Sequence, residues 1–224
     1  MKRLIIFAFF LLAAACVFGQ NFEAVIRDIT GTVELKTGGS AEWIPANDGD
    51  RIQKATLIST GFKSMALLEI GDSAILVLPL TRLSLEELLM QDNTETINVG
   101  LQSGRARLDV NPPAGAKTNL SVQSPMATAS VRGTSFEMDT VKINVFEGMV
   151  KFESAAGQPV LVYAGQSSLV DMETGRVLNP FNLAATERRL PDLPGQTSGR
   201  VSSDQNAVKI IGYFKANLTL EPLQ

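Results

Sequence analysis

Apolar and polar residues alternate in short runs over most of the chain, from Asn21 to about Asn179. In Thr32–Leu35, Ala106–Val110 and Ile143–Phe146 every second residue is apolar. A period of two is typical of strands that bury one face, and glycine turns separate the runs. The pattern predicts an all-β fold over residues 21–179, a single antiparallel β-sandwich or roll.

Glycine turns predict where the strands reverse. Gly71-Asp72 and Glu147-Gly148 each lie between two apolar runs, and glycine supplies the positive φ of a tight hairpin turn. Three segments, beginning at Gly31, Gly104 and Gly148, share a glycine followed by alternating polar and apolar residues. Their spacing is unequal, which argues against a regular solenoid and favours ordinary turn-to-strand junctions.

Ala127–Met138 reads as one strand with an interruption at Arg132-Gly133-Thr134. The apolar face falls on odd-numbered residues before Gly133 and on even-numbered residues after it. We therefore expect a β-bulge at Gly133 that re-aims Arg132. Arg132 then has two candidate roles. Its guanidinium pairs with a carboxylate or with carbonyls freed by the bulge, or it is exposed and binds an acidic ligand or partner.

The N-terminus has the pattern of a secretory signal. Lys2 and Arg3 precede the apolar run Leu4–Phe18, which is shorter than the roughly 20 residues of a spanning helix. We expect residues 1–19 to be a cleaved signal peptide, with an uncleaved anchor as the alternative. Cys16 ends a weak lipobox, so lipidation there is a second alternative. The protein is thus expected to be exported, either periplasmic or secreted.

Residues 180–224 differ in composition from the rest of the chain. Pro180, Pro191, Pro194 and Gly195 precede the polar run Gln196–Asp204, and this pattern predicts a Pro-, Gly- and Ser-containing linker with a partly flexible C-terminal tail. Apolar residues return in Asn206–Leu220, either as a last strand of the domain or as a contact for a partner.

Composition excludes several kinds of chemistry. The net charge of −3 offers no basic field for nucleic acid. The chain has no histidine, its one cysteine lies in the signal-like segment, and its carboxylates are scattered, so we expect neither catalysis nor a cofactor. Asn47–Asp50 supplies oxygen ligands suited to calcium, but it lacks the EF-hand frame and is expected to be a turn.

Ser124–Phe136 resembles the central signature of the FecR domain family, Thr-Pro-x-Ala-x-x-x-Val-Arg-Gly-Thr-x-Phe, with serine in place of the first threonine. Other segments agree with the family over about residues 25–170. They contain Gly31-Thr32-Val33, Trp43, Gly49–Ile52, Ser59–Gly61, Gly71-Asp72, Phe146–Val150 and Ala164–Gln166.

The resemblance implies an all-β extracytoplasmic module without catalytic residues. Family regulators pass a signal from an outer-membrane transporter to a cytoplasmic sigma factor, through a cytoplasmic segment and a membrane span. Because a signal sequence is expected here instead, sigma-factor regulation is not expected to carry over. The residues of the implied structural signature are Pro125, Val131, Arg132, Gly133, Thr134, Phe136, Glu147 and Gly148.

Two functions from different classes fit the sequence. The first is a protein-interaction or sensing module in the bacterial cell envelope, with an envelope protein as its partner. The second is a glycan- or peptidoglycan-binding module that uses Trp43, Tyr163 or Tyr213 for stacking. Arg132 and Trp43 are the candidate binding residues. Membrane contact is expected only if Cys16 is lipidated or the signal is retained.

Overall fold

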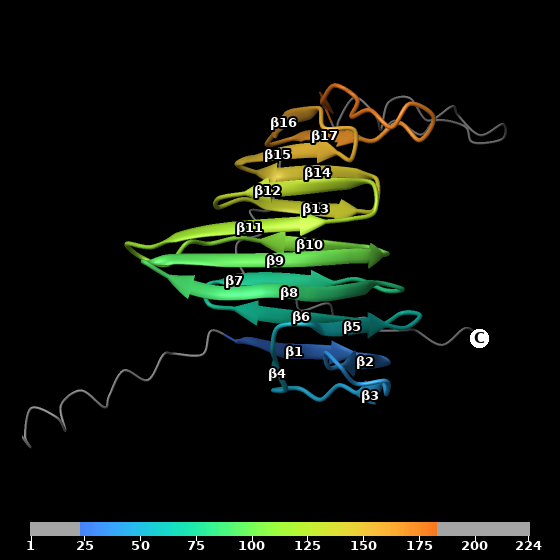
Figure 1. The fold of residues 1–224 in the computed structure, drawn as a ribbon, viewed down its shortest axis with the longest axis vertical. Helices are drawn as coiled ribbons and strands as arrows, with labels where there is room; N and C mark the ends of the chain where they lie inside the picture. Colours follow the sequence, from blue (N-terminus) through green and yellow to red (C-terminus); the bar gives the residue numbers. More distant parts are fainter. Residues whose placement is uncertain (1–22, 183–224) are drawn as a thin grey trace, which may run out of the picture. The chain divides into compact units, whose positions relative to one another are not determined.

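The computed structural model describes residues 23–182, which form two nine-stranded β-sheets. Figure 1 looks onto the stacked sheets, whose strands follow one another from the blue end at β1 to the orange end at β17. All neighbouring strands are antiparallel except β9 and β11, which are parallel. The predicted all-β sandwich is confirmed.

The strands of the two sheets follow one another in space in this order. The first sheet is β18 (Phe181–Asn182), β17 (Gln166–Leu169), β14 (Lys142–Glu147), β13 (Ser135–Asp139), β10 (Arg105–Asp109), β7 (Ser73–Val77), β6 (Met65–Ile70), β1 (Ala24–Thr30) and β4 (Arg51–Ile52). The second is β16 (Pro159–Tyr163), β15 (Met149–Ser154), β12 (Ala127–Val131), β11 (Lys117–Gln123), β9 (Thr94–Ser103), β8 (Arg82–Gln91), β5 (Thr56–Thr60), β2 (Val33–Lys36) and β3 (Ile44–Pro45).

The core lies between the two sheets and is built from the alternating apolar residues. Ala129 and Val131 of β12 are buried, as are Phe136 and Met138 of β13. The change of parity across Gly133 is therefore real, and both sets of residues face the core. Fully buried phenylalanines such as Phe136 contribute several kcal/mol each, because truncation to alanine typically costs about 3–5 kcal/mol.

The chain passes repeatedly from one sheet to the other, and glycine marks several of these crossings. Gly31 joins β1 to β2, Gly104 joins β9 to β10, and Gly148 joins β14 to β15, each with φ between 72° and 81°. The shared glycine pattern in the sequence is therefore a sheet-switching corner. The hairpin at Gly71-Asp72 is confirmed, with Ile70 opposite Ser73.

Two predictions about corners are wrong. Glu147-Gly148 does not close a hairpin, because β14 and β15 belong to different sheets. Gly133 does not lie in a β-bulge, because β12 ends at Val131 and β13 begins in the other sheet at Ser135. The bulge lies instead in β14, where Ser135 pairs with Glu147 and Phe136 with Val145, which leaves Phe146 as the extra residue.

The first and last strands can be compared with the limits expected for the β domain, residues 21 and 179. Strand pairing begins at Ala24 and continues through β18, just past the boundary expected at Asn179. The expected signal peptide, Cys16 and the tail at Asn206–Leu220 lie outside the described residues. Residues 23–182 contain no helix with the length and apolar character needed to cross a membrane.

Candidate binding surface at the Arg132 corner

Two sheet-switching corners pack against each other at the family-like signature. Arg132–Thr134 joins β12 to β13, and Gly148 lies between β14 and β15. Gly133 has φ +95° and Gly148 has φ +75°, a region that side chains disfavour. A Cβ on Gly148 would lie 3.0 Å from the Gly133 carbonyl oxygen and 3.3 Å from the Thr134 methyl group. Gly148 is thus required both by its conformation and by this close approach.

Thr134 ties the corner to two other strands. Its side chain is buried, and its N–H and C=O pair with the C=O and N–H of Val110 at 3.1 and 3.0 Å. Its hydroxyl donates to the carbonyl of Met149 at 3.3 Å. The backbone next to Arg132 is therefore held by β10 on one side and by β15 on the other.

Arg132 itself is exposed at this fixed corner. Within residues 23–182 its guanidinium forms no ion pair and no hydrogen bond. The expectation that it pins the sheet through a carboxylate or through freed carbonyls is therefore wrong for the described part of the chain. The position leaves the guanidinium available to a ligand or partner.

Arg132 borders a shallow hollow of about 630 Å³ on the outer face of the second sheet. One row of side chains crosses four strands there, because Ser121 pairs with both Asn98 and Ser130, and Ser130 pairs with Lys151. These side chains are small and polar except for Lys151, whose ammonium group lies 2.7 Å from Glu153. Arg132 is therefore the cation of this hollow that has no carboxylate partner among the described residues.

One exposed apolar side chain lines the hollow and a second lies next to it. Met149 at the start of β15 is 46% exposed, and Tyr163 of β16 lies directly opposite it and is 50% exposed. The local sequence patterns did not associate Met149 and Tyr163 with Arg132. Their proximity depends on the pairing of β15 with both β12 and β16, which local patterns do not reveal.

Trp43, the other candidate binding residue, lies elsewhere. It precedes β3, and five strands of the second sheet separate β3 from β12. At roughly 4.8 Å between strands the two are some 29 Å apart. The indole already has the Lys36 ammonium and the Arg82 guanidinium at 5.9 and 5.4 Å from its ring centre. A sugar stacked on Trp43 would compete with these cations, and Tyr213 lies outside the described residues.

The remaining signature residues have structural positions. Val131 and Phe136 are buried in the core, whereas Pro125 and Glu147 are exposed. Pro125 lies in the β11–β12 turn, where the Ser124 hydroxyl accepts a hydrogen bond from the Ala127 N–H at 3.0 Å. Serine thus provides the hydroxyl that the family's threonine would bring to this turn.

Asn47–Asp50, which was weighed as a calcium loop and expected to be a turn, forms a turn. The Asp50 carboxylate accepts a hydrogen bond from the Asn47 N–H at 2.8 Å, and Gly49 has φ +93°. Residues 23–182 contain no cluster of three side chains suited to hold a metal ion.

Comparison with known proteins places the two corners inside a family match. Residues 56–151 match the family model described as FecR protein. This segment is similar to FecR proteins. The match runs from β5 into the start of β15, so it includes Arg132, Gly133, Thr134 and Gly148. Strands on both sides of the FecR match continue the same two sheets.

Solved structures and curated proteins complete the comparison. Two crystal structures of a candidate anti-sigma factor from Parabacteroides distasonis, at 1.65 and 2.50 Å resolution, are 16% and 17% identical to this chain with TM-scores of 0.46 and 0.48. Each alignment covers 56% of this chain and 59% of the solved chain, so the chain spans less than two thirds of their length. No curated protein matches.

Proposed function

We propose that this FecR-like protein is a non-catalytic interaction module of the bacterial cell envelope, and that it binds another envelope protein at the Arg132 corner. The observation that carries the proposal is the exposed guanidinium of Arg132, without a partner in residues 23–182, on a backbone fixed by buried Thr134. A fixed corner loses little conformational entropy on binding.

The composition of the surface favours a protein partner. Arg, Tyr and Met are enriched in protein interfaces, and Arg and Tyr are enriched among the residues that dominate binding energy. Arg132 at the end of β12, Met149 of β15 and Tyr163 of β16 provide one of each, and β12, β15 and β16 are neighbours in the second sheet. We infer an acidic or carbonyl-rich contact on the partner opposite Arg132, with apolar side chains against Met149 and Tyr163.

The cellular setting rests on sequence and family. The signal-like residues 1–19 support export to the periplasm or beyond, and the FecR match supports a regulatory or sensing role.

A glycan is the second candidate ligand. The row of Asn98, Ser121 and Ser130 offers an amide, which already donates to Glu87 at 2.6 Å, and two hydroxyl groups suited to sugar hydroxyls. Tyr163, opposite Met149 at the edge of the hollow, is suited to stacking. A polysaccharide or peptidoglycan strand on this row would contact the same Arg132.

In-cell photo-crosslinking separates the two candidates. A photo-reactive residue replaces exposed Ser130 in the full chain, and another replaces exposed Gln53 at the β4–β5 turn as the position control. The proposal predicts that position 130 captures one envelope protein, that position 53 does not, and that Arg132→Ala abolishes the capture. Capture of glycan fragments alone at position 130, or equal capture at both positions, would contradict it.

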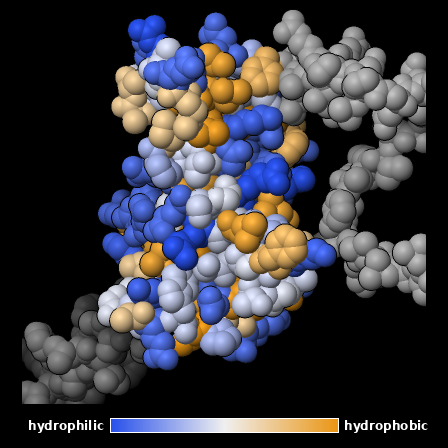
Figure 2. Space-filling model, turned by 90° about the vertical axis from the view of Figure 1, so that its right-hand side faces the viewer, coloured by the Kyte–Doolittle hydropathy of each residue, from blue (hydrophilic) through white to orange (hydrophobic). Residues whose placement is uncertain are grey.

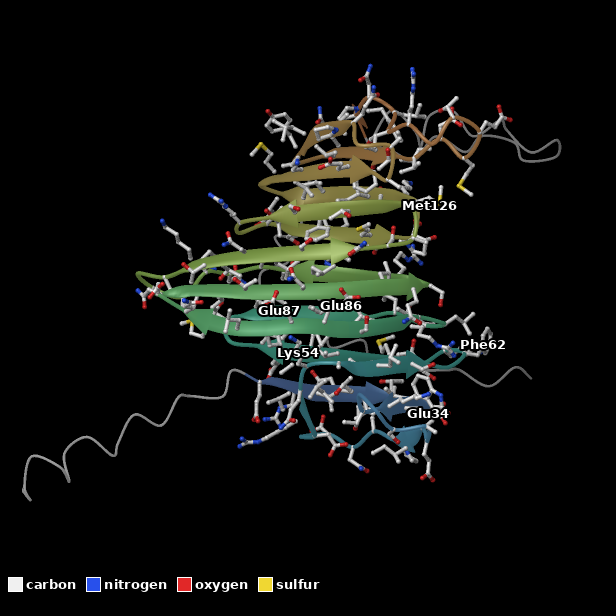
Figure 3. All side chains as sticks on the ribbon, viewed as in Figure 1. Glu34, Lys54, Phe62, Glu86, Glu87 and Met126 are labelled. Atoms are coloured by element: carbon white, nitrogen blue, oxygen red, sulfur yellow. The ribbon has the colours of Figure 1, made fainter. Side chains whose placement is uncertain are left out.

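A matched charge control accompanies Arg132→Ala. Lys54 is an exposed cation in the turn between β4 and β5, and it is labelled in Figure 3. Lys54→Ala removes the same unit of charge without touching the Arg132 corner, and should leave the crosslink intact.

A further inference from the structure

Four corners at one end of the strands are joined by hydrogen bonds. They are residues 30–32, 61–64, 78–81 and 103–105. The Thr32 N–H donates to the Ser64 hydroxyl at 2.8 Å, and the Leu80 N–H donates to the Gly61 carbonyl at 3.2 Å. The Thr81 hydroxyl donates to the carbonyl of Arg105 at 2.9 Å. These corners form one connected surface, at the opposite end of the strands from the β12–β13 and β14–β15 corners (Figure 1).

Two apolar side chains project from this surface, Phe62 at 75% exposure and Leu80 at 62%. Figure 3 shows Phe62 at the tip of the β5–β6 corner, and Figure 2, which faces this end, shows apolar side chains in the open. We call Phe62, Lys63 and Leu80 the apolar tip. Phe62 and Leu80 do not belong to the buried core, so core packing does not explain why these positions are apolar.

The backbone of the apolar tip is strained and nevertheless fixed. Lys63 has φ +53° and Leu80 has φ +57°, a left-handed conformation in which glycine or asparagine is usual. Buried Thr60 holds the loop of Leu80, because its hydroxyl donates to the Leu78 carbonyl at 2.6 Å and accepts from the Thr81 N–H at 3.0 Å. Buried Ser64 holds the loop of Lys63, because its hydroxyl accepts from the Thr32 N–H and donates to the Phe62 carbonyl at 3.1 Å. Strained residues held by their surroundings cluster at functional sites.

The charges around the apolar tip point to its partner. None of the four corners contains Asp or Glu, although the whole chain is acidic at −3. Their two cations are Lys63 and Arg105, and Arg105 is paired with Glu137 at 3.2 Å. Lys63 lies with its ammonium 5.6 Å from the ring centre of Phe62 and forms no ion pair with the described residues. Acids do lie beside these corners, because Asp139 of β13 is the cross-strand neighbour of Arg105. Within the corners themselves, two apolar side chains and a cation without acids match an anionic lipid surface.

We propose that the apolar tip rests on the surface of an anionic bilayer, with Phe62 and Leu80 at the headgroup boundary and Lys63 among the lipid phosphates. A protein pocket is the competing occupant, because exposed Thr30, Thr32 and Ser103 offer hydroxyl groups for a hydrogen-bonded rim. The cation beside Phe62 and the absence of acids from the four corners favour the lipid surface. Two side chains anchor a protein only weakly and reversibly. The contact therefore orients a domain that something else holds near the membrane, and leaves the Arg132 corner at the other end accessible.

Depth-dependent fluorescence quenching in the full chain tests this contact. Trp43→Phe removes the one native tryptophan, and either Phe62→Trp or Met172→Trp then adds a probe. Met172 is a matched control because it is an apolar residue at 69% exposure in the loop after β17. Any attachment of the N-terminus to the vesicle is the same in both variants, so it cannot cause a difference in quenching between the probes at positions 62 and 172.

The probes are read on vesicles of phosphatidylethanolamine with brominated phosphatidylglycerol. We expect roughly two-fold quenching and a blue shift at position 62, since interfacial side chains reach about 5–10 Å into the headgroup boundary, and neither change at position 172. Absence of quenching at position 62 would overturn the proposal. Equal quenching at both positions would also overturn it, because it would indicate adsorption without orientation.

Lys63→Gln tests the electrostatic part, with Lys54→Gln as the control for lost charge. Only Lys63→Gln should reduce the quenching at position 62. The change should have the same direction as replacing brominated phosphatidylglycerol by brominated phosphatidylcholine, which keeps the quencher and removes the lipid charge. Thermal unfolding of each variant checks that the domain is intact. If Lys63→Gln and Lys54→Gln reduce the quenching at position 62 equally, Lys63 has no specific part in the electrostatic attraction to the anionic lipid.

Discussion

Gly148→Ala is the sharpest test of the packed corners. The substitution adds a Cβ at φ +75°, 3.0 Å from the Gly133 carbonyl and 3.3 Å from the Thr134 methyl group. Both neighbours are held, because Thr134 is buried and bonded to Val110 in both directions. Neither neighbour can move without breaking contacts on other strands.

The magnitude follows from two contributions. A left-handed conformation costs an L-residue about 1–2 kcal/mol, and the lower entropy of the unfolded alanine chain offsets about 0.4–1 kcal/mol of this. Overpacking against a fixed backbone adds about 1–3 kcal/mol. Gly148→Ala should thus lower the free energy of unfolding by about 2–4 kcal/mol.

Gly165→Ala is the matched control. Gly165 has φ +77°, and a Cβ there meets no atom within 4 Å. It should cost only the conformational term, about 1 kcal/mol. A domain of this size loses about 2–4 °C in Tm per kcal/mol, so Gly148→Ala should melt roughly 4–8 °C below Gly165→Ala. The measurement is thermal and urea unfolding followed by circular dichroism. Equal losses in the two variants would refute the packing of the corners.

Three further predictions follow from the same geometry. Arg132→Ala should change the free energy of unfolding by less than about 0.5 kcal/mol in urea titrations, because the side chain is exposed and has no partner in residues 23–182. Thr134→Val should cost about 1 kcal/mol in the same titrations, since it keeps the shape but leaves the Met149 carbonyl without its donor. The N–H groups of Glu173 and Thr174 lower the pKa of the Asp171 carboxyl, so an NMR titration should place its midpoint below that of an ordinary aspartate. Because this pKa is depressed by folding, its small stabilising effect should be present above about pH 4 and fade as the pH falls further.

The sequence predicted which residues face the core but not which sheet they belong to. Alternation before and after Gly133 correctly indicated that Val131 and Phe136 point inward. In a two-sheet sandwich the interior is the same for both sheets, so a strand that crosses between them keeps an apolar inner face. The bulge at Gly133 and the hairpin at Gly148 were therefore natural but wrong interpretations of sheet-switching corners.

The candidate sites differ in how far local patterns could reveal them. Arg132 stood out because a charged residue interrupts an apolar run. Met149 and Tyr163 join it only through the order of β12, β15 and β16, which depends on contacts distant in sequence. Phe62 gave no signal at all, since one aromatic residue after Gly61 looks like the end of a strand.

The central claim is that the Arg132 corner is a rigid support and that the Arg132 side chain is a binding contact. The most direct measurement is the Kd of the captured envelope protein for the wild-type chain, Arg132→Ala and Lys54→Ala, with the Tm of each. We expect at least about 30-fold weaker binding for Arg132→Ala, the loss typical of a dominant interface residue, with an unchanged Tm and an unaffected Lys54→Ala. An unchanged Kd for Arg132→Ala, or a fall in its Tm together with its affinity, would contradict this claim.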